Sequence, residues 1–258
     1  MNNHKHCYLI EFQYLGFRYH GWQKQPAVKT VQEMMERTVS FVLKHDEFKL
    51  LASGRTDAMV SAEQAFVELF LKADIDGPMF LKDLNYNLPA DIRALSIEPV
   101  GQDFNVIQDS KEKEYNYLFT YGSKIHPFCA PFLTRFAEQL DVDLMSEAAK
   151  LFEGKHNFIN FCKRPSPDAL SEREVFQSEI VLNELITASF LPEKSWLFRV
   201  KGPGFMRHQV RMMMGALAQV GNGELSLVDL GLLLESKSEK FILTAPASGL
   251  MIQSINFQ

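Results

Sequence analysis

Cysteines are few and long apolar runs are absent in this 258-residue chain. The three cysteines, Cys7, Cys129 and Cys162, are odd in number and far apart, so they form neither a disulfide framework nor a Cys-x-x-Cys metal pair. No apolar run approaches the roughly 20 residues that a membrane span needs, and residues 1–7 lack the apolar core of a secretion signal. We therefore expect a cytoplasmic protein that does not associate with membranes.

The common cofactor loops are missing as well. Residues 202–204 and 221–223 each supply only two glycines of a dinucleotide fingerprint, and no Gly-Lys-Ser/Thr sequence exists for a phosphate loop. His156 and His208 lack a neighbouring serine or cysteine nucleophile signature. The sequence thus gives no support to a nucleotide-cofactor enzyme or to a hydrolase with a Ser-His or Cys-His pair.

Acidic residues are absent from two windows of an otherwise acidic protein. The formal net charge is −5, which argues against a protein that coats nucleic acid indiscriminately. Residues 12–32 nevertheless contain three basic residues and no acid, and residues 199–223 contain four basic residues and no acid. This distribution is compatible with a basic cleft on an acidic body, and equally with chance clustering on solvated faces.

Hydrophobic periodicity predicts strands and helices in an irregular order. Thr30 and Glu33 have the form of a helix capping box, and so do Ser226 and Asp229. Residue 154 is a glycine suited to end the helix before it. Strands are predicted at 8–12, 48–52, 65–71, 92–97, 114–121, 176–185 and 195–201, and helices at 31–44, 78–86, 143–152, 205–219 and 226–234. This order favours an α+β fold with an antiparallel or mixed sheet.

A polar loop at 53–58, SGRTDA, lies between two predicted apolar strands. Such a loop holds the carboxylate of Asp57 and the guanidinium of Arg55 at the edge of a rigid sheet, where catalytic groups are well placed. On the residues alone, Asp57 is more often a turn-capping aspartate than a catalyst.

The loop GRTDA at 54–58 resembles the signature of the tRNA pseudouridine synthase A family. Further segments fall in the order of that family: GWQKQ at 21–25 with TVQE at 30–33, NLPADI at 87–92, KEYNY at 113–117, GKHNF at 154–158, FMRHQVR at 205–211 and APASGL at 245–250. The resemblance covers nearly the whole chain.

The resemblance implies that uridine in tRNA is isomerised to pseudouridine, without cofactor or metal: the N1–C1′ bond breaks and a C5–C1′ bond forms. It assigns Asp57 as the essential carboxylate, which attacks carbon or removes a proton from the sugar, and the sequence leaves both routes open. Tyr115 matches the tyrosine that stacks on the target base. Arg211 matches the basic residue that pairs with the aspartate and keeps it ionised.

Six further residues are candidates for binding the substrate. Arg55 is implied by the resemblance to enter the base stack when the target uridine is extruded. The remaining candidates are Arg18, Trp22, Lys24, Arg207 and His208. The aromatic and basic residues around Trp22 fit an RNA surface or a hydrophobic loop anchor equally well. The predicted helix 205–219 places Arg207 and Arg211 four residues apart on one face.

The implied fold is the α+β pseudouridine synthase fold, with two sheet-and-helix subdomains, residues 1–103 and 104–258, around a central basic cleft. The family implies a homodimer and, as substrate position, the anticodon stem-loop around positions 38–40. Four positions depart from the family pattern, Leu15, Met59, Ser61 and Ile107. They change the rim that would meet RNA and not the three assigned catalytic residues.

Two other classes of function remain open on the sequence. A catalytically silent RNA-binding relative would bind tRNA in a salt-dependent way that survives Asp57→Ala. A carboxylate enzyme acting on a glycoside would need a second acid near Asp57, for which Glu63 and Glu68 are near in sequence.

Overall fold

The computed structural model describes residues 5–166, 170–238 and 240–257, and divides the chain into two compact units. The first comprises Met1–Lys111 and Ile252–Gln258, and the second Glu112–Met251. The boundary predicted from the sequence lies between residues 103 and 104. The observed first unit continues to Lys111 and includes most of the last strand, although that strand is far away in sequence.

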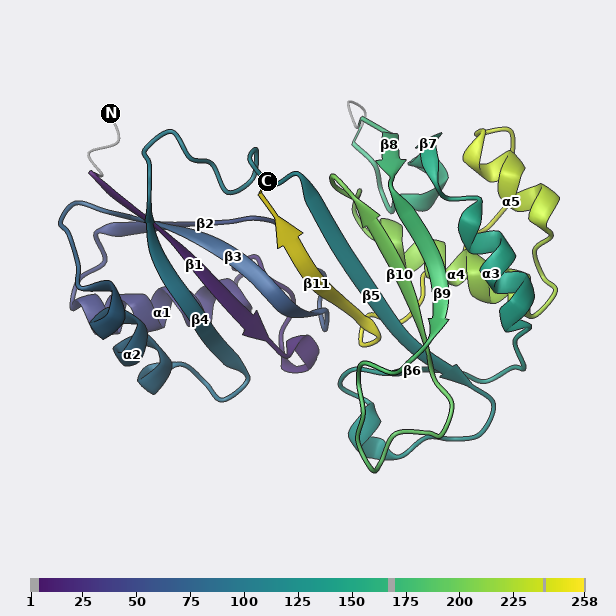
Figure 1. Ribbon diagram of the computed structural model, residues 1–258, viewed down its shortest axis with the longest axis horizontal. Helices are drawn as coiled ribbons and strands as arrows, with labels where there is room; N and C mark the ends of the chain where they lie inside the picture. Colours follow the sequence, from purple (N-terminus) through teal and green to yellow (C-terminus); the bar gives the residue numbers. More distant parts are fainter. Residues whose placement is uncertain (1–4, 167–169, 239, 258) are drawn as a thin grey trace. The chain divides into compact units, whose positions relative to one another are not determined.

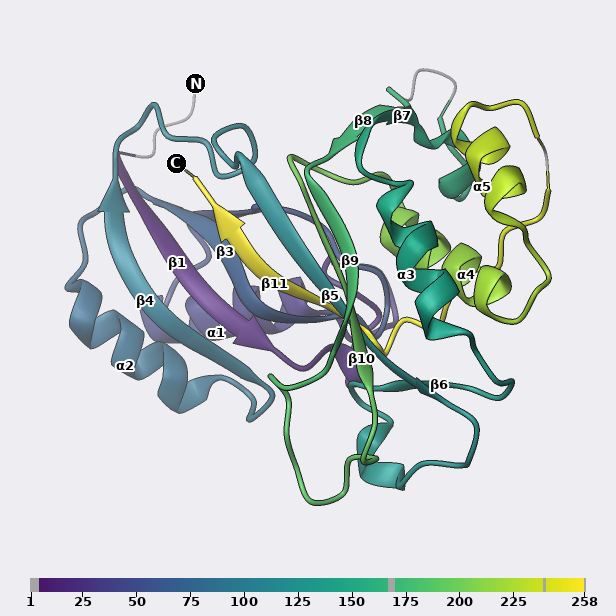
Figure 2. The ribbon, with the colours of Figure 1, turned by 45° about the vertical axis from the view of Figure 1, so that its right-hand side comes forward.

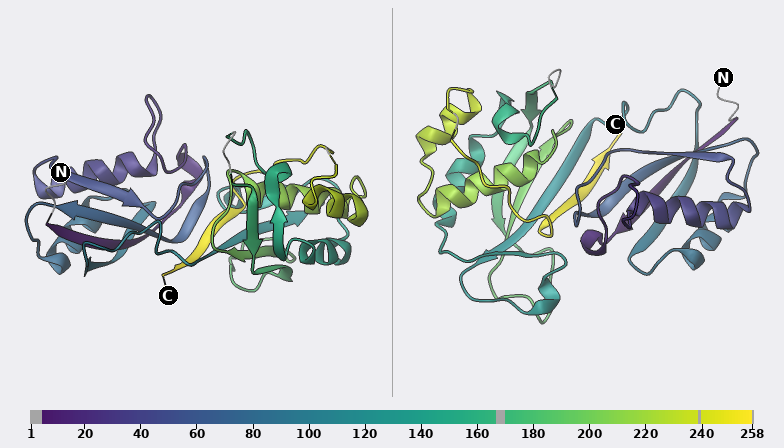
Figure 3. Two further views of the ribbon diagram at one scale, coloured as in Figure 1. Left: turned by 90° about the horizontal axis from the view of Figure 1, so that it is seen from above. Right: turned by 180° about the vertical axis from the view of Figure 1, so that it is seen from behind.

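The first unit is an antiparallel sheet with two helices on one face (Figures 1 and 3). Its strands are β1 (His6–Tyr14), β2 (Phe48–Ala52), β3 (Ser61–Leu71), β4 (Ile92–Val100) and the larger part of β11 (Leu250–Asn256). β1 lies between β3 and β4, and β2 and β11 both adjoin β3. The helices α1 (Val31–Leu43) and α2 (Gly77–Asn87) pack against each other, and η1 (Gly16–Arg18) follows β1.

The second unit is built around the long strand β5 (Glu112–Tyr121) (Figure 2). β5 pairs with β10 (Trp196–Gly202), which pairs with β9 (Gln177–Leu182), and the short strand β6 (Thr134–Phe136) joins β5 in parallel. β7 (Gly154–Asn157) and β8 (Glu172–Val175) form a separate ribbon. The helices are α3 (Val142–Lys150), α4 (Gln209–Gly221) and α5 (Leu227–Leu234), with the short turns η2 (Pro127–Cys129) and η3 (Phe158–Phe161).

The predicted capping residues begin helices where the sequence places them. The Thr30 side chain accepts a hydrogen bond from the Glu33 backbone, and Ser226 with Asp229 forms a complete capping box. An Asp at the N-cap of α2 and of α3 acts in the same way. The α+β class with a mixed sheet is confirmed.

Two predictions in the second unit were wrong, and a third needs new bounds. The helix predicted from residue 205 begins at Gln209, because His208 has a left-handed backbone with a φ of 63° that a continuing helix cannot accommodate. Gly154 does not end α3, which stops at Lys150, and instead begins β7. The strand predicted at 176–185 is present but shorter, because β9 covers Gln177–Leu182 and the preceding strand β8 ends at Val175.

No helix within residues 5–166, 170–238 and 240–257 combines the length and the apolar character that crossing a bilayer requires.

Candidate active site

The Asp57 loop, residues 53–60, connects β2 to β3 and is held by backbone contacts with the segment 19–22. The Trp22 N–H donates to the Thr56 carbonyl at 3.2 Å, and the Met59 N–H donates to the Tyr19 carbonyl at 3.0 Å. The Thr56 hydroxyl also lies 2.9 Å from the Tyr14 hydroxyl at the end of β1. The backbone on both sides of Asp57 is therefore fixed, at Thr56 before it and at Met59 after it. The Asp57 side chain itself is half-buried.

Glycine is needed where segment 19–22 meets this loop. Gly21 has a φ of 90°, and a Cβ added there would lie 2.5 Å from the Thr56 carbonyl oxygen. That distance is shorter than any real Cβ contact, and the backbone conformation itself favours glycine. The GWQKQ segment therefore packs closely against the backbone of the GRTDA loop and supports it.

Asp91 fixes the start of the same segment and the residues just before it. Its carboxylate accepts hydrogen bonds from Arg18 Nε at 2.6 Å and from the Tyr19 hydroxyl at 2.7 Å, and its carbonyl accepts from the Leu15 N–H. Burial raises the pKa of Asp91, but the hydrogen bonds from Arg18 and Tyr19 outweigh it, and the pKa lies below the ordinary value. Burial and the bond to Asp91 raise the pKa of Tyr19. The NLPADI motif therefore supplies a carboxylate that supports this segment, a role that the sequence alone did not predict.

The predicted substrate-binding residues of the first unit differ in what they contact. The Trp22 side chain is 5% exposed and its ring packs 5.5 Å from that of Phe12, so the loop-anchor interpretation describes its place. Arg18 is paired with Asp91, and Lys24 with Glu36 at 2.8 Å. Arg55 is exposed at the loop.

Neither acid near Asp57 in sequence is arranged as a catalytic partner. Glu63 is exposed, whereas Glu68 is buried in β3, with Oε2 accepting from the Val106 N–H at 3.2 Å. Burial raises the pKa of Glu68. Its carboxylate holds the 104–109 segment, which accounts for its position without a catalytic role.

Tyr115 lies on β5 in the second unit and is half-buried. Its ring contacts that of Phe205 edge-to-face, with centroids 5.2 Å apart. Further along β5, Phe119 and Tyr121 both stack on Trp196. The second unit therefore brings the KEYNY strand and the first residue of FMRHQVR together.

Arg211 lies in the first turn of α4 and its guanidinium is held from two sides. Nε donates to the Ala245 carbonyl at 2.8 Å, and Nη1 lies 3.1 Å from Nδ1 of His208. Because arginine has only donors, Nδ1 accepts this hydrogen bond and His208 carries its proton on Nε2. The Ala245 N–H in turn donates to the Arg211 carbonyl at 3.0 Å.

The segment 243–249 that supplies the Ala245 carbonyl is fixed in place by close contacts. A Cβ on Gly215 would lie 1.7 Å from the Leu243 carbonyl oxygen, and a Cβ on Gly249 2.8 Å from that of Leu118. The Tyr117 hydroxyl donates to the Pro246 carbonyl at 2.7 Å and lies 2.9 Å from Thr134 Oγ1. Burial raises the pKa of Tyr117, so its phenol stays protonated as a donor.

Arg207 does not share a helix face with Arg211, contrary to the prediction, because it precedes α4 and is exposed in the turn before it. His208 is half-buried at the N-cap. Gly215, in the middle of α4, is the sequence signal for the close approach of residues 243–249. Glycine is disfavoured inside a helix unless another backbone packs against it.

The fold and the order of the sequence motifs fit an enzyme of the pseudouridine synthase class, and comparison with known proteins specifies the family. The family model described as tRNA pseudouridine synthase matches residues 11–109 and 148–258. This chain belongs to the tRNA pseudouridine synthase family.

Relatives similar to this chain carry the name tRNA pseudouridine synthase A. The protein of Limosilactobacillus fermentum is 31% identical over 98% of this chain and 96% of its own length. That of Pseudothermotoga lettingae is 33% identical over 97% and 99%, and that of Staphylococcus epidermidis 32% over 96% and 89%. A solved Cbf5-Nop10-Gar1 complex overlaps with a TM-score of 0.33 at 13% identity, covering 94% of this chain and 56% of that one.

Proposed function

We propose that this protein isomerises uridine to pseudouridine in tRNA, with Asp57 as the essential carboxylate. Support comes from family membership over most of the chain, together with the braced loop that holds Asp57. The reaction is balanced within the substrate: the N1–C1′ bond breaks, a C5–C1′ bond forms, the C5 proton leaves and N1 takes one up. An ionised Asp57 acts at the ribose, as nucleophile or as base.

The roles of Tyr115 and Arg211 follow from the same motifs. Tyr115 stacks on the extruded base and assists removal of the C5 proton, and its edge contact with Phe205 keeps the ring in one orientation. The family resemblance assigns Arg211 to orient and stabilise the carboxylate of Asp57. The two hydrogen bonds from Arg211 to His208 and Ala245 supply the preorganisation that such a role needs.

Substrate contacts are assigned to the exposed cations. Arg55, beside Asp57, inserts where the uridine leaves the stack, and Arg207 binds phosphate before α4. We also propose that the substrate position is in the anticodon stem-loop around positions 38–40, and that the protein acts as a homodimer. Mapping pseudouridine in tRNA from cells lacking this protein tests the first assignment, and light scattering tests the second.

The decisive experiment compares Asp57→Asn with Asp83→Asn, which makes the same charge change at an exposed position of α2. We expect Asp57→Asn to abolish product from a tRNA transcript, measured by mass spectrometry of nucleosides, while Asp83→Asn retains wild-type yield. Normal yield from Asp57→Asn would refute the assignment.

The same assay separates the alternatives. A silent RNA-binding relative would bind tRNA without turnover in the wild type. An enzyme acting on small glycosides would turn over a free nucleoside and leave the tRNA unchanged.

A further inference from the structure

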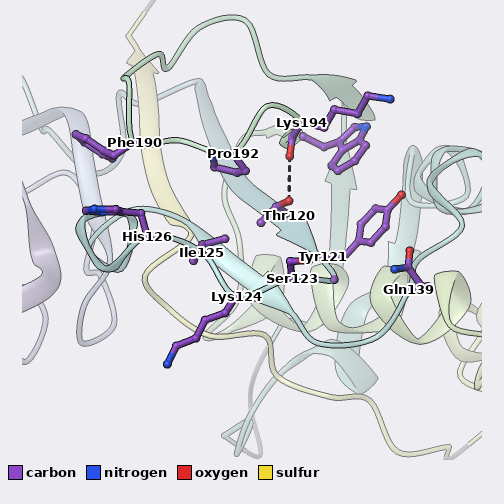
Figure 4. Close-up of a pocket in the computed structure, with 12 residues that line it drawn as sticks. Thr120, Tyr121, Ser123, Lys124, Ile125, His126, Gln139, Phe190, Pro192 and Lys194 are labelled. Carbon is purple, nitrogen blue, oxygen red and sulfur yellow. Dashed lines mark hydrogen bonds between the residues drawn. The ribbon is translucent and has the colours of Figure 1, made fainter.

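A cavity of about 420 Å³ lies in the second unit, between the residues that follow β5 and those that precede β10 (Figure 4). Thr120 and Tyr121 line it, at the far end of β5 from Tyr115. Tyr121 comes six positions after Tyr115, which corresponds to about 20 Å along a strand. The cavity is thus distinct from the turn that holds Arg211 and contacts Tyr115.

The two walls of the cavity are connected to each other and rest on an apolar base. The Thr120 hydroxyl donates to the Lys194 carbonyl at 2.9 Å, as the dashed line in Figure 4 shows. Ile125 and Phe190, one from each wall, pack against the buried cluster formed by Leu118, Cys129, Leu133 and Leu197. The cavity is therefore largely formed before any ligand binds.

An aromatic stack ends at the cavity. Trp196 stacks on Phe119 with centroids 6.0 Å apart, and Tyr121 stacks on Trp196 with centroids 5.1 Å apart and an interplanar angle of 15°. Tyr121 is the last ring of this series and lines the cavity, with Gln139 beside it in Figure 4. A planar base can extend such a stack, and the Gln139 amide offers both a donor and an acceptor to its edge.

Basic residues lie in or beside the lining of the same cavity. Lys124 and Lys194 are exposed, and neither forms an ion pair with another residue in the described part of the chain. Arg135 donates through Nε to the Gly122 and Ser123 carbonyls at the rim, at 2.7 and 3.1 Å. The exposed acids Glu138 and Glu193 are adjacent in sequence to lining residues and offset part of this charge. This balance favours a ligand recognised by stacking and by charge together.

We propose that this cavity binds one nucleotide of the RNA substrate, a nucleotide other than the target uridine, with its base on Tyr121 and its flanking phosphates at Lys124 and Lys194. The inference rests on the proposed function in that it takes RNA as the substrate. The distance from Tyr115 makes the site an anchor that raises affinity for a long RNA and has no part in the chemical step.

The test measures binding of fluorescently labelled tRNA to the full chain by anisotropy at several salt concentrations. In the double variant Lys124→Ala/Lys194→Ala we expect affinity near 0.1 M salt to fall by about tenfold or more. We also expect the slope of log K against log salt to fall by about 1 to 2, because about two phosphate contacts are lost. The control, Lys82→Ala/Lys237→Ala, removes two exposed lysines elsewhere, of which Lys237 is ion-paired with Glu235, and should retain the wild-type slope.

The aromatic contribution is tested by Tyr121→Leu, which should weaken binding, and Tyr121→Phe, which should restore it. Thermal unfolding shows whether each variant folds, and if Tyr121→Leu does not, the lysine variant decides alone. Product formation at saturating tRNA should be unchanged in the lysine variant. Because binding is measured without turnover, a wild type that makes no pseudouridine would refute the proposed function and not the cavity assignment.

Wild-type affinity and salt slope in the lysine variant would overturn the proposal. So would an equal loss in the Lys82/Lys237 control. A change in oligomeric mass with unchanged tRNA affinity would identify the cavity as a protein contact and would overturn it as well.

Discussion

The turn after Asp57 and the turn before Arg211 share an uncommon backbone conformation but use it differently. Met59 has a φ of 68° and His208 a φ of 63°, both in the left-handed region that favours glycine. At Met59 the backbone N–H is bonded to Tyr19, and the side chain has no hydrogen-bonding group to offset the strain. At His208 the side chain accepts a hydrogen bond from Arg211. The left-handed backbone at Met59 is therefore tolerated because the neighbouring segment fixes it. At His208 it is tolerated because it lets the side chain position Arg211.

The largest effect is expected from a substitution that displaces segment 19–22, which fixes the turn after Asp57. Gly21→Ala places a Cβ against the Thr56 carbonyl in a left-handed backbone, so we expect a loss of at least about 2 kcal/mol in the free energy of unfolding. Urea denaturation measures it. Gly231→Ala is the control, because a Cβ there meets nothing within 4 Å and the helix gains from alanine. Equal stability of Gly21→Ala and wild type would show that segment 19–22 does not constrain the loop.

His208 should affect catalysis more than stability. His208→Gly keeps the left-handed backbone but removes the acceptor for Arg211, so we expect kcat to fall by about 10- to 100-fold with a smaller change in KM. His208→Asn tolerates the same backbone and places an amide oxygen at the position of Nδ1, so it should recover most of the rate. A loss of the same size in both variants would mean that the hydrogen bond to Arg211 does not matter. A rise in KM alone would indicate a direct substrate contact.

Asp91 should contribute a pH-dependent part of the stability. Its pKa is lower in the folded protein, so its contribution is complete above the ordinary aspartate pKa and is lost as the pH falls through the lower folded value. Asp91→Asn should therefore lower the free energy of unfolding by about 1–3 kcal/mol at neutral pH, and the difference from wild type should shrink in acid. Urea titrations at several pH values check this. A difference that stays constant down to acidic pH would contradict it.

The smallest effect is expected at Met59. Met59→Gly relieves the left-handed strain but increases the freedom of the unfolded chain, so we expect a net gain of up to about 1 kcal/mol in the free energy of unfolding. Thermal unfolding with a global fit measures it. A loss of stability would show that the methionine side chain makes packing contacts that outweigh the strain.

Local signals predicted much of this fold because they depend on few residues. The Thr30 and Ser226 caps act within one helical turn. The contacts that position the motif residues join segments far apart in sequence, such as Asp91 with Arg18 and Ala245 with Arg211, and no local pattern encodes them. The left-handed His208 was missed because the apolar periodicity of 205–219 continues across it. β11 was missed because its apolar run is short and irregular.

The contact between Gly215 and the Leu243 carbonyl joins the middle of α4 to a segment close to the end of the chain. A polypeptide that stopped before residue 245 would retain Arg211 but would lack the oxygen that receives its Nε hydrogen. The closing stretch of the chain therefore completes the surroundings of an arginine synthesised more than thirty residues earlier, and a late truncation should impair activity as directly as a substitution beside the reacting groups.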